Sequence, residues 1–79
     1  MIVKIEQVIN ATDSPRWCVM KMANVLRRQG QIEPLQVRTY APGSYITFDQ
    51  DPHGADIVQA ANMLGWNTLL ITIKDRYEK

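Results

Sequence analysis

The sequence has a single cysteine, Cys18, among its 79 residues. One cysteine excludes an internal disulfide, and no second thiol is present to share a metal ion. Cys18 stands between Trp17 and Val19, where we expect a packed thiol and not a reactive one. The sequence therefore predicts neither a metal centre built on thiolates nor a disulfide-stabilised secreted domain.

Long apolar runs are also missing from the sequence. No segment approaches the roughly 20 consecutive apolar residues that a membrane-spanning helix requires. Residues 1–9 alternate in polarity and carry Lys4 and Glu6, unlike the continuous apolar core of a signal peptide. We therefore expect no membrane partner and a soluble protein in the reducing cytoplasm.

The chain is short, and 46% of its 79 residues are apolar while 22% are charged. These fractions are typical of a globular protein and not of a disordered chain. We expect a single domain over residues 1–79. A domain of this size has only a small core, so we expect a homo-oligomer or a protein partner to add stability.

Alternating polarity and turn residues predict six elements of secondary structure. They are a strand at 2–9, a helix at 15–29, strands at 34–40 and 45–48, a helix from 51 to 64, and a strand at 67–73. We expect the two middle strands to form a hairpin and the apolar last strand to lie inside the sheet. The fold class is therefore α/β (α+β), a two-layer β-α-β-β-α-β domain with a charged tail at 74–79 that frays.

The first predicted helix has recognisable ends and an apolar stripe. Ser14 is expected to be the N-cap with Pro15 at the first helical position, and Gly30 follows the last turn. The residues expected to face the core recur at intervals of three and four: Cys18, Val19, Met22, Val25 and Leu26.

Charge is unevenly distributed along the chain, although the net charge is only +1. Between residues 14 and 48 the only acidic residue is Glu33. The cations there are Arg16, Lys21, Arg27, Arg28 and Arg38, and Trp17 stands beside the first of them. This combination of cations and an indole that can stack on bases predicts a nucleic-acid partner. Because the net charge is small, we expect the binding to be weak and salt-sensitive. Exposed Trp17, Met20 and Tyr40 leave a protein partner as the alternative.

Residues 49–56 are acidic instead, and no cation occurs among them. Asp51 followed by Pro52 is a strong helix start, with a carboxylate at the N-cap and proline at the first helical position. We expect Asp51 and Asp56 to satisfy the free amide groups that would otherwise bind an external anion.

The order of these segments resembles the N-terminal domain of ParB and its relative sulfiredoxin, over roughly residues 5–75. The resemblance is carried by Pro15-Arg16, by GQIEPLQVR at 30–38, by Tyr45, and by GADIVQAANMLGW at 54–66. It implies the ParB/sulfiredoxin fold, with His53 and Gly54 as the remnant of a phosphate-binding turn.

The positions that this family uses for phosphate differ in the present sequence. Residues 55–57 read Ala-Asp-Ile where family members place basic residues, and no Arg or Lys occurs between Arg38 and Lys74. A carboxylate repels a phosphate group instead of neutralising it. Sulfiredoxin chemistry also requires a cysteine in this turn, whereas Cys18 lies in the first predicted helix. We therefore predict a divergent small member of the family that lacks its basic phosphate-binding motif.

His53 is the only histidine, so any catalytic triad or histidine metal site has one candidate. Its neighbours Asp49 and Asp51 could accompany it as a catalytic group, although their spacing matches no established metal motif. We expect a surface histidine and neither metal nor cofactor. The alternative left open is a divergent enzyme centred on His53, Asp51 and Asp49, either nucleotide-binding or a nuclease that uses a divalent metal ion.

Together these observations predict a non-catalytic binding module for a nucleic acid or a protein. We expect the partner to meet the face from Trp17 to Arg28, together with Arg38. Such a module, with the fold kept and the phosphate-binding residues lost, is consistent with a protein encoded by a mobile element.

Overall fold

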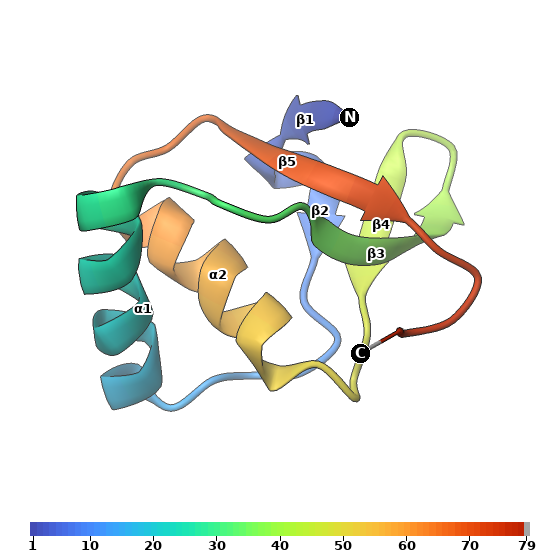
Figure 1. Cartoon of the computed structure of the whole chain (residues 1–79). Helices are drawn as coiled ribbons and strands as arrows, with labels where there is room; N and C mark the ends of the chain where they lie inside the picture. Colours follow the sequence, from blue (N-terminus) through green and yellow to red (C-terminus); the bar gives the residue numbers. More distant parts are fainter. Residues whose placement is uncertain (79) are drawn as a thin grey trace.

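The computed structural model describes residues 1–78, and Lys79, the end of the expected tail, lies outside the described residues. Its elements are β1 (Ile2–Lys4), the 3-10 turn η1 (Ile5–Gln7), β2 (Val8–Ile9), α1 (Arg16–Gln29), β3 (Leu35–Ala41), β4 (Ser44–Thr47), α2 (Pro52–Met63) and β5 (Thr68–Ile73). Both helices lie on one face of the sheet, and α2 lies between α1 and the strands (Figure 1). The predicted α/β fold class is confirmed.

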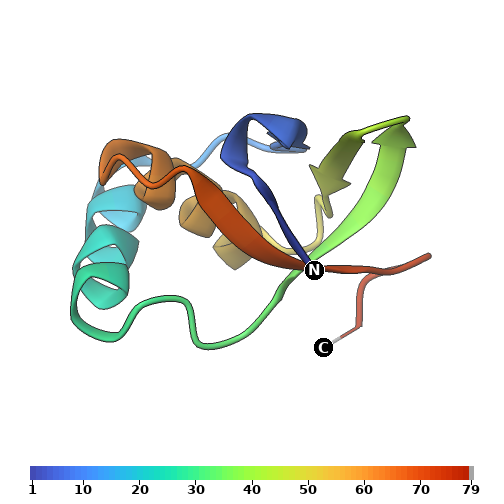
Figure 2. The ribbon, with the colours of Figure 1, turned by 90° about the horizontal axis from the view of Figure 1, so that it is seen from above.

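The strands form one mixed sheet in the order β1-β5-β3-β4-β2. β3 and β4 pair antiparallel, with Val37 opposite Thr47, and β5 runs parallel to β3 inside the sheet. Both features follow the predictions. The hairpin forms because the turn at 41–44 supplies Pro42 and a glycine with a φ of 74° at Gly43. The hairpin lies at the end of the molecule away from α1 (Figure 2).

The single strand predicted at 2–9 is wrong, because η1 divides it into β1 and β2. The side chain of Gln7 holds the turn: its Oε1 accepts from the Lys4 amide at 2.9 Å, and its Nε2 donates to the Gly43 carbonyl at 3.0 Å. The turn shifts the alternation by one residue, so Val3 and Val8 are buried while Ile9 is exposed. β1 and β2 consequently pair at opposite edges of the sheet, with β5 and β4 respectively.

Helix α1 occupies the predicted range but differs in its start and in its buried face. Pro15, not Ser14, is the N-cap, and no side chain caps the helix. The buried residues are Val19, Ala23 and Leu26, whereas the predicted core residue Val25 is 44% exposed. The buried stripe of α1 is therefore rotated from the predicted one. The helix packs chiefly on α2, which covers only a narrow face of α1.

Helix α2 is the central packing element, and its predicted start at Asp51-Pro52 is confirmed. Its alanines at 55, 60 and 61 are fully buried, and such small side chains allow α1 and the sheet to approach it closely. Across from them, Val37, Leu69 and Ile71 of β3 and β5 complete the core.

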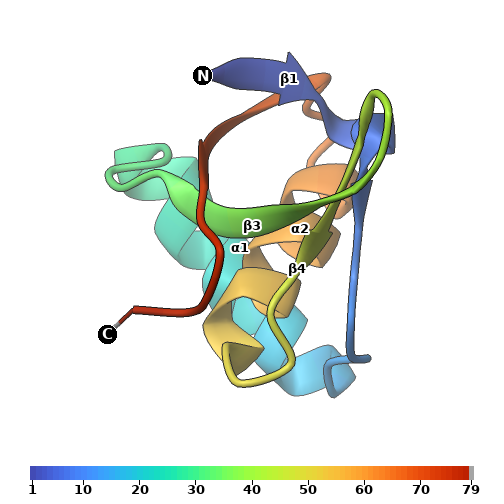
Figure 3. The same cartoon turned by 90° about the vertical axis from the view of Figure 1, so that its right-hand side faces the viewer.

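The C-terminal segment 74–78 is ordered against the sheet, so the expectation of a fraying tail is wrong for these residues. The side chain of Gln36 on β3 accepts from the Glu78 amide at 2.9 Å and donates to the Glu78 carbonyl. Lys74 forms an ion pair with Glu78 at 3.4 Å, and the rings of Tyr77 and Phe48 lie 6.0 Å apart. The segment therefore returns across the end of β3 (Figure 3).

Neither helix within residues 1–78 combines the length and the apolar character that crossing a membrane requires.

Candidate functional site

The outer face of α1 is the first candidate surface. Because α1 covers α2 with one side only, the opposite side is exposed along the helix. Arg16, Trp17, Lys21, Arg27 and Arg28 are all exposed; helical spacing places Trp17, Lys21 and Arg28 on the side away from α2, with Arg16 and Arg27 at its edge. Trp17 is 67% exposed, which leaves most of its indole available to a partner. The structure thus brings together five of the six residues predicted to bind.

The charge of this face is not neutralised within the molecule. α1 contains no acidic residue, and the only ion pair among residues 1–78 joins Lys74 to Glu78. The single side-chain hydrogen bond of these cations is from Arg27 Nη1 to Asn24 Oδ1 at 3.3 Å, along the helix itself. The four cations therefore remain free to meet phosphate groups.

Arg38, the sixth predicted binding residue, lies elsewhere. It is on β3, and α2 separates that strand from α1 (Figure 1). Its side chain lines a cavity of about 450 Å³ on the face of the sheet that carries no helix. The other residues lining this cavity are Ala11, Ile46, Thr47, Phe48, Asp49, Gln50, Asp75, Arg76 and Tyr77. Arg38 and the α1 residues predicted with it therefore lie on two separate surfaces.

The turn before α2 shows how the sequence fills the N-terminus of that helix with its own side chain. Asp51 is 8% exposed, and its Oδ1 accepts from the Gly54 amide at 3.1 Å. A Cβ at Gly54 would lie 2.8 Å from the Asp51 Oδ2 and 3.0 Å from Leu35 Cδ1, so glycine is required by close packing. An internal carboxylate thus occupies the amide that an external anion would use.

Asp56 does not share that role, contrary to the sequence prediction. It follows the first turn of α2, and none of the side-chain hydrogen bonds within residues 1–78 involves it. Asp56 is nonetheless 8% exposed, so a second carboxylate is buried near the start of α2. Its position still opposes phosphate binding.

The residues of the enzymatic alternative are not gathered into one site. His53 and Asp51 line a second cavity, of about 310 Å³, whereas Asp49 lines the cavity of Arg38. The Asp51 carboxylate is engaged by the Gly54 amide, and within residues 1–78 no three His, Cys, Asp or Glu side chains are grouped to hold a metal ion. This geometry favours neither the nuclease nor a histidine-based catalytic group.

Sequence reasoning missed the contribution of the C-terminal segment. Arg76 and Tyr77 line the cavity of Arg38, and Tyr77 also lines the cavity of His53. The local signal at 74–79 is a charged run after the last strand, and the pairing of Gln36 with Glu78 cannot be read from it.

Cys18, expected to be a packed thiol, is free and half-buried on α1, away from the turn.

Three solved structures resemble the chain over almost its whole length. The first is the C-terminally truncated chromosome-partitioning protein ParB from Caulobacter crescentus, complexed to the centromeric parS site. It aligns with a TM-score of 0.76 at 21% identity, and the alignment covers 99% of this chain and 40% of the ParB chain. Sulfiredoxin from Arabidopsis thaliana gives a TM-score of 0.72 at 21% identity, covering 96% and 86%. The same truncated ParB complexed with CTP-gamma-S gives 0.71 at 21% identity, covering 99% and 45%. The chain has the fold of ParB and sulfiredoxin.

The ParB/sulfiredoxin fold expected from the residue pattern is therefore confirmed, and 21% identity establishes no more than the fold. No family model matches the sequence, and a comparison with curated proteins finds no match. The chain spans less than half of either ParB chain but most of sulfiredoxin. Within this fold, the exposed α1 face and the cavity of Arg38 are two candidate binding surfaces.

Proposed function

We propose that this chain is a non-catalytic binding module of the ParB/sulfiredoxin fold and that the outer face of α1 binds nucleic acid. The observation that carries the proposal is a helix with four cations, no carboxylate and an indole that is 67% exposed. Cations that lack an internal partner gain most from phosphate groups, because binding releases the counterions condensed on the nucleic acid.

The arrangement of the face suits single-stranded or flexible nucleic acid. Arg16 and Arg28 lie near the two ends of α1, a helix of 14 residues, which corresponds to a length of about 20 Å. Trp17 lies beside Arg16 and provides a flat surface on which a base can stack, whatever that base is. The ParB complex described above contains parS DNA, and its fold is the one this chain shares, which supports the same class of partner.

The absence of an assembled catalytic group supports the non-catalytic part of the proposal. His53 and Asp49 line different cavities, and the Asp51 carboxylate is committed to the helix cap. We expect no cleavage of DNA or RNA in Mg²⁺ or Mn²⁺. Cleavage that disappears in His53→Ala or Asp51→Asn would establish the enzymatic alternative instead.

Fluorescence anisotropy with labelled single-stranded and double-stranded DNA and RNA tests the binding. We expect weak binding, with the emission of Trp17 quenched on addition of single strands. The double variant Arg27→Gln/Arg28→Gln should lose most of the affinity, whereas Arg38→Gln, on the other site, should keep it. Equal affinities of the two variants, or no binding at low salt, would overturn the proposal.

A protein partner is a second candidate, favoured by apolar side chains around the C-terminal half of α1. Val25 and Ile32 are 44% and 69% exposed there, and Met20, on the N-terminal half of the helix, is 49% exposed. Met22, Gly30 and Ile57 join Val25 and Ile32 around a cavity of about 230 Å³. Light scattering on the purified chain measures whether a second copy covers this surface. A monomer at high concentration would leave only a different protein as its partner.

A further inference from the structure

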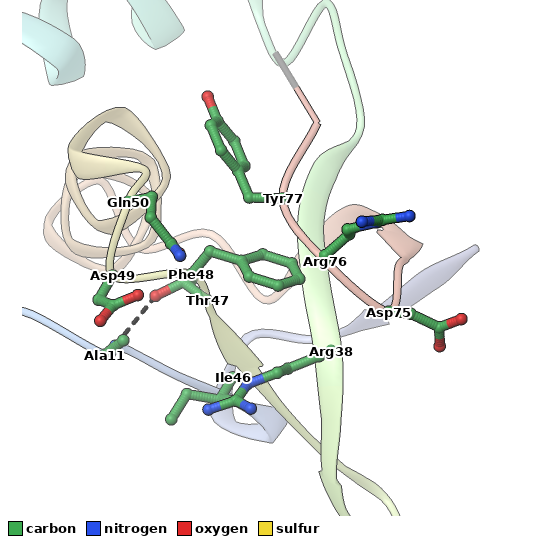
Figure 4. A pocket seen from close by; sticks show the side chains of 10 residues that line it. All are labelled: Ala11, Arg38, Ile46, Thr47, Phe48, Asp49, Gln50, Asp75, Arg76 and Tyr77. Carbon is green, nitrogen blue, oxygen red and sulfur yellow. Dashed lines mark hydrogen bonds between the residues drawn. The ribbon is translucent and has the colours of Figure 1, made fainter.

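The cavity of Arg38 has the size and position of a small-molecule site. It lies on the outer side of the sheet where β4 ends, and its volume is about 450 Å³. Cavities that hold one small ligand start at roughly 300 Å³. Side chains from β3, from the segment after β4 and from the C-terminal segment surround it (Figure 4). This site is independent of the α1 face.

Two opposite charges stand on the same side of the cavity without neutralising each other. The side chain of Arg38 extends past Ile46 toward the side where Asp49 lies, while Arg76 extends the other way (Figure 4). Neither Arg38 nor Asp49 forms an ion pair among residues 1–78. A guanidinium group can hold a carboxylate with two parallel hydrogen bonds, and a free aspartate accepts from N–H groups.

The cavity also offers aromatic surface. That surface belongs to the half-buried Tyr77, because Phe48 is only 6% exposed; the two rings pack with centroids 6.0 Å apart and planes inclined by 45°. Aromatic pairs of this kind accept a further ring in offset or edge-to-face contact. The Thr47 hydroxyl accepts from the Ala11 amide at 3.0 Å, which fixes the end of β4.

The charges of the lining argue against a phosphate group as the main ligand. The cavity is lined by two arginines, Arg38 and Arg76, and by two aspartates, Asp49 and Asp75, so the formal charges cancel. A phosphate group, with a charge of about −1.5 to −2, would be repelled by Asp49 and could not use both arginines, which point apart. A group with one carboxylate and a neighbouring N–H donor matches Arg38 and Asp49 together.

We propose that this cavity binds an aromatic α-amino acid, either free or as the last residue of a peptide. The α-carboxylate pairs with Arg38, the adjacent amine or amide N–H donates to Asp49, and the aromatic ring packs against Tyr77, which Phe48 supports from below the surface. The shared chemistry is a carboxylate and an N–H group on one carbon atom that also carries an aromatic side chain.

NMR titration of the ¹⁵N-labelled chain tests this assignment with L-phenylalanine, phenylpropionate, phenethylamine and a tetrapeptide ending in phenylalanine. We expect phenylalanine to shift the amide signals of residues 46–50 and 76–77, with a Kd on the order of 1 mM. Phenethylamine, which lacks the carboxylate, should bind about tenfold more weakly. Tighter binding of the tetrapeptide would identify peptide C-termini as the source, and tighter binding of phenylalanine would identify the free amino acid.

Two exposed substitutions separate the roles of the charges. Arg38→Gln should weaken both phenylalanine and phenylpropionate by about tenfold, whereas Asp49→Asn should weaken only phenylalanine. Arg28→Gln, on α1, is the matched control and should change neither. The proposal is overturned by the absence of shifts up to the solubility limit of phenylalanine, by unchanged affinity in Arg38→Gln, or by tighter binding of phenyl phosphate or CTP at the same residues.

Discussion

At the residue scale, the start of α2 depends on the contact between Asp51 and Gly54. The Asp51 carboxylate accepts from the Gly54 amide, and the absence of a Cβ on Gly54 leaves room for that carboxylate and for Leu35. Both residues are buried, so water cannot readily replace the hydrogen bond if the carboxylate is removed. The pair therefore links the position of α2 to β3.

Replacing Asp51 by alanine should lower the free energy of unfolding by about 1 kcal/mol, because a helix N-cap is lost. Asp51→Asn keeps an N-cap acceptor and should change it much less. Asp49→Ala, at an exposed position that caps nothing, is the matched control. Urea denaturation measures all three, and an Asp51→Ala variant as stable as the control would contradict the role given to this carboxylate.

Gly54→Ala should be destabilising by about 1–3 kcal/mol, although alanine is the better helix former, because the new methyl group overlaps Asp51 and Leu35. The double variant Asp51→Ala/Gly54→Ala should cost less than the sum of the two single changes, since the shortened side chain makes room for the methyl group. A stabilised Gly54→Ala variant, or strict additivity, would show that the close approach is not limiting.

At the scale of the elements, local signals made some parts predictable. The hairpin and α2 follow from Pro42-Gly43 and Asp51-Pro52, whose effects act within one turn of chain. Gln7 and Gln36 act differently, because each holds a segment far away in the sequence, at Gly43 and at Glu78. The division of the first strand and the ordered C-terminal segment could therefore not be predicted from sequence patterns.

The same limit applies to the sites. The basic face of α1 was predictable, because helical spacing alone places Trp17, Lys21 and Arg28 on one side. The separation of Arg38 from that face depends on the sheet topology, and its proximity to Arg76 depends on how the C-terminal segment returns. No periodicity in the sequence carries that information.

The C-terminal segment provides a test of one such long-range contact. Gln36→Ala removes both hydrogen bonds to Glu78 and should lower the local opening free energy there by about 1 kcal/mol. Hydrogen exchange at the Glu78 amide should become several-fold faster. Gln7→Ala, which releases Gly43 instead, should leave this amide unchanged; the same acceleration in both variants would indicate a global effect.

At the scale of the whole molecule, the small core leaves little stability in reserve. Ile71 is 1% exposed at the centre of the sheet, so Ile71→Val should cost about 0.5–1.5 kcal/mol. In a domain of this size that loss should lower the Tm by roughly 4–8 °C per kcal/mol. Ile73→Val, at a 43% exposed position on the same strand, is the control and should change the Tm little.

The molecule presents two candidate binding faces, separated by α2 and the sheet. The α1 face offers cations and an indole to an extended polyanion, and the cavity of Arg38 offers opposite charges to a small ligand. Because no residue belongs to both, substitutions at one face should leave binding at the other unchanged. The Arg28 and Arg38 variants examine this independence in both directions.

The most direct test of nucleic-acid binding by α1 is the salt dependence of affinity for single-stranded DNA. With four cations engaged, the slope of log K against log salt should be roughly −3, and Arg27→Gln/Arg28→Gln should reduce it to roughly −1.5. Arg38→Gln should keep the full slope. A slope near zero for the unmodified chain, or one that falls in Arg38→Gln and not in the α1 variant, would contradict the account.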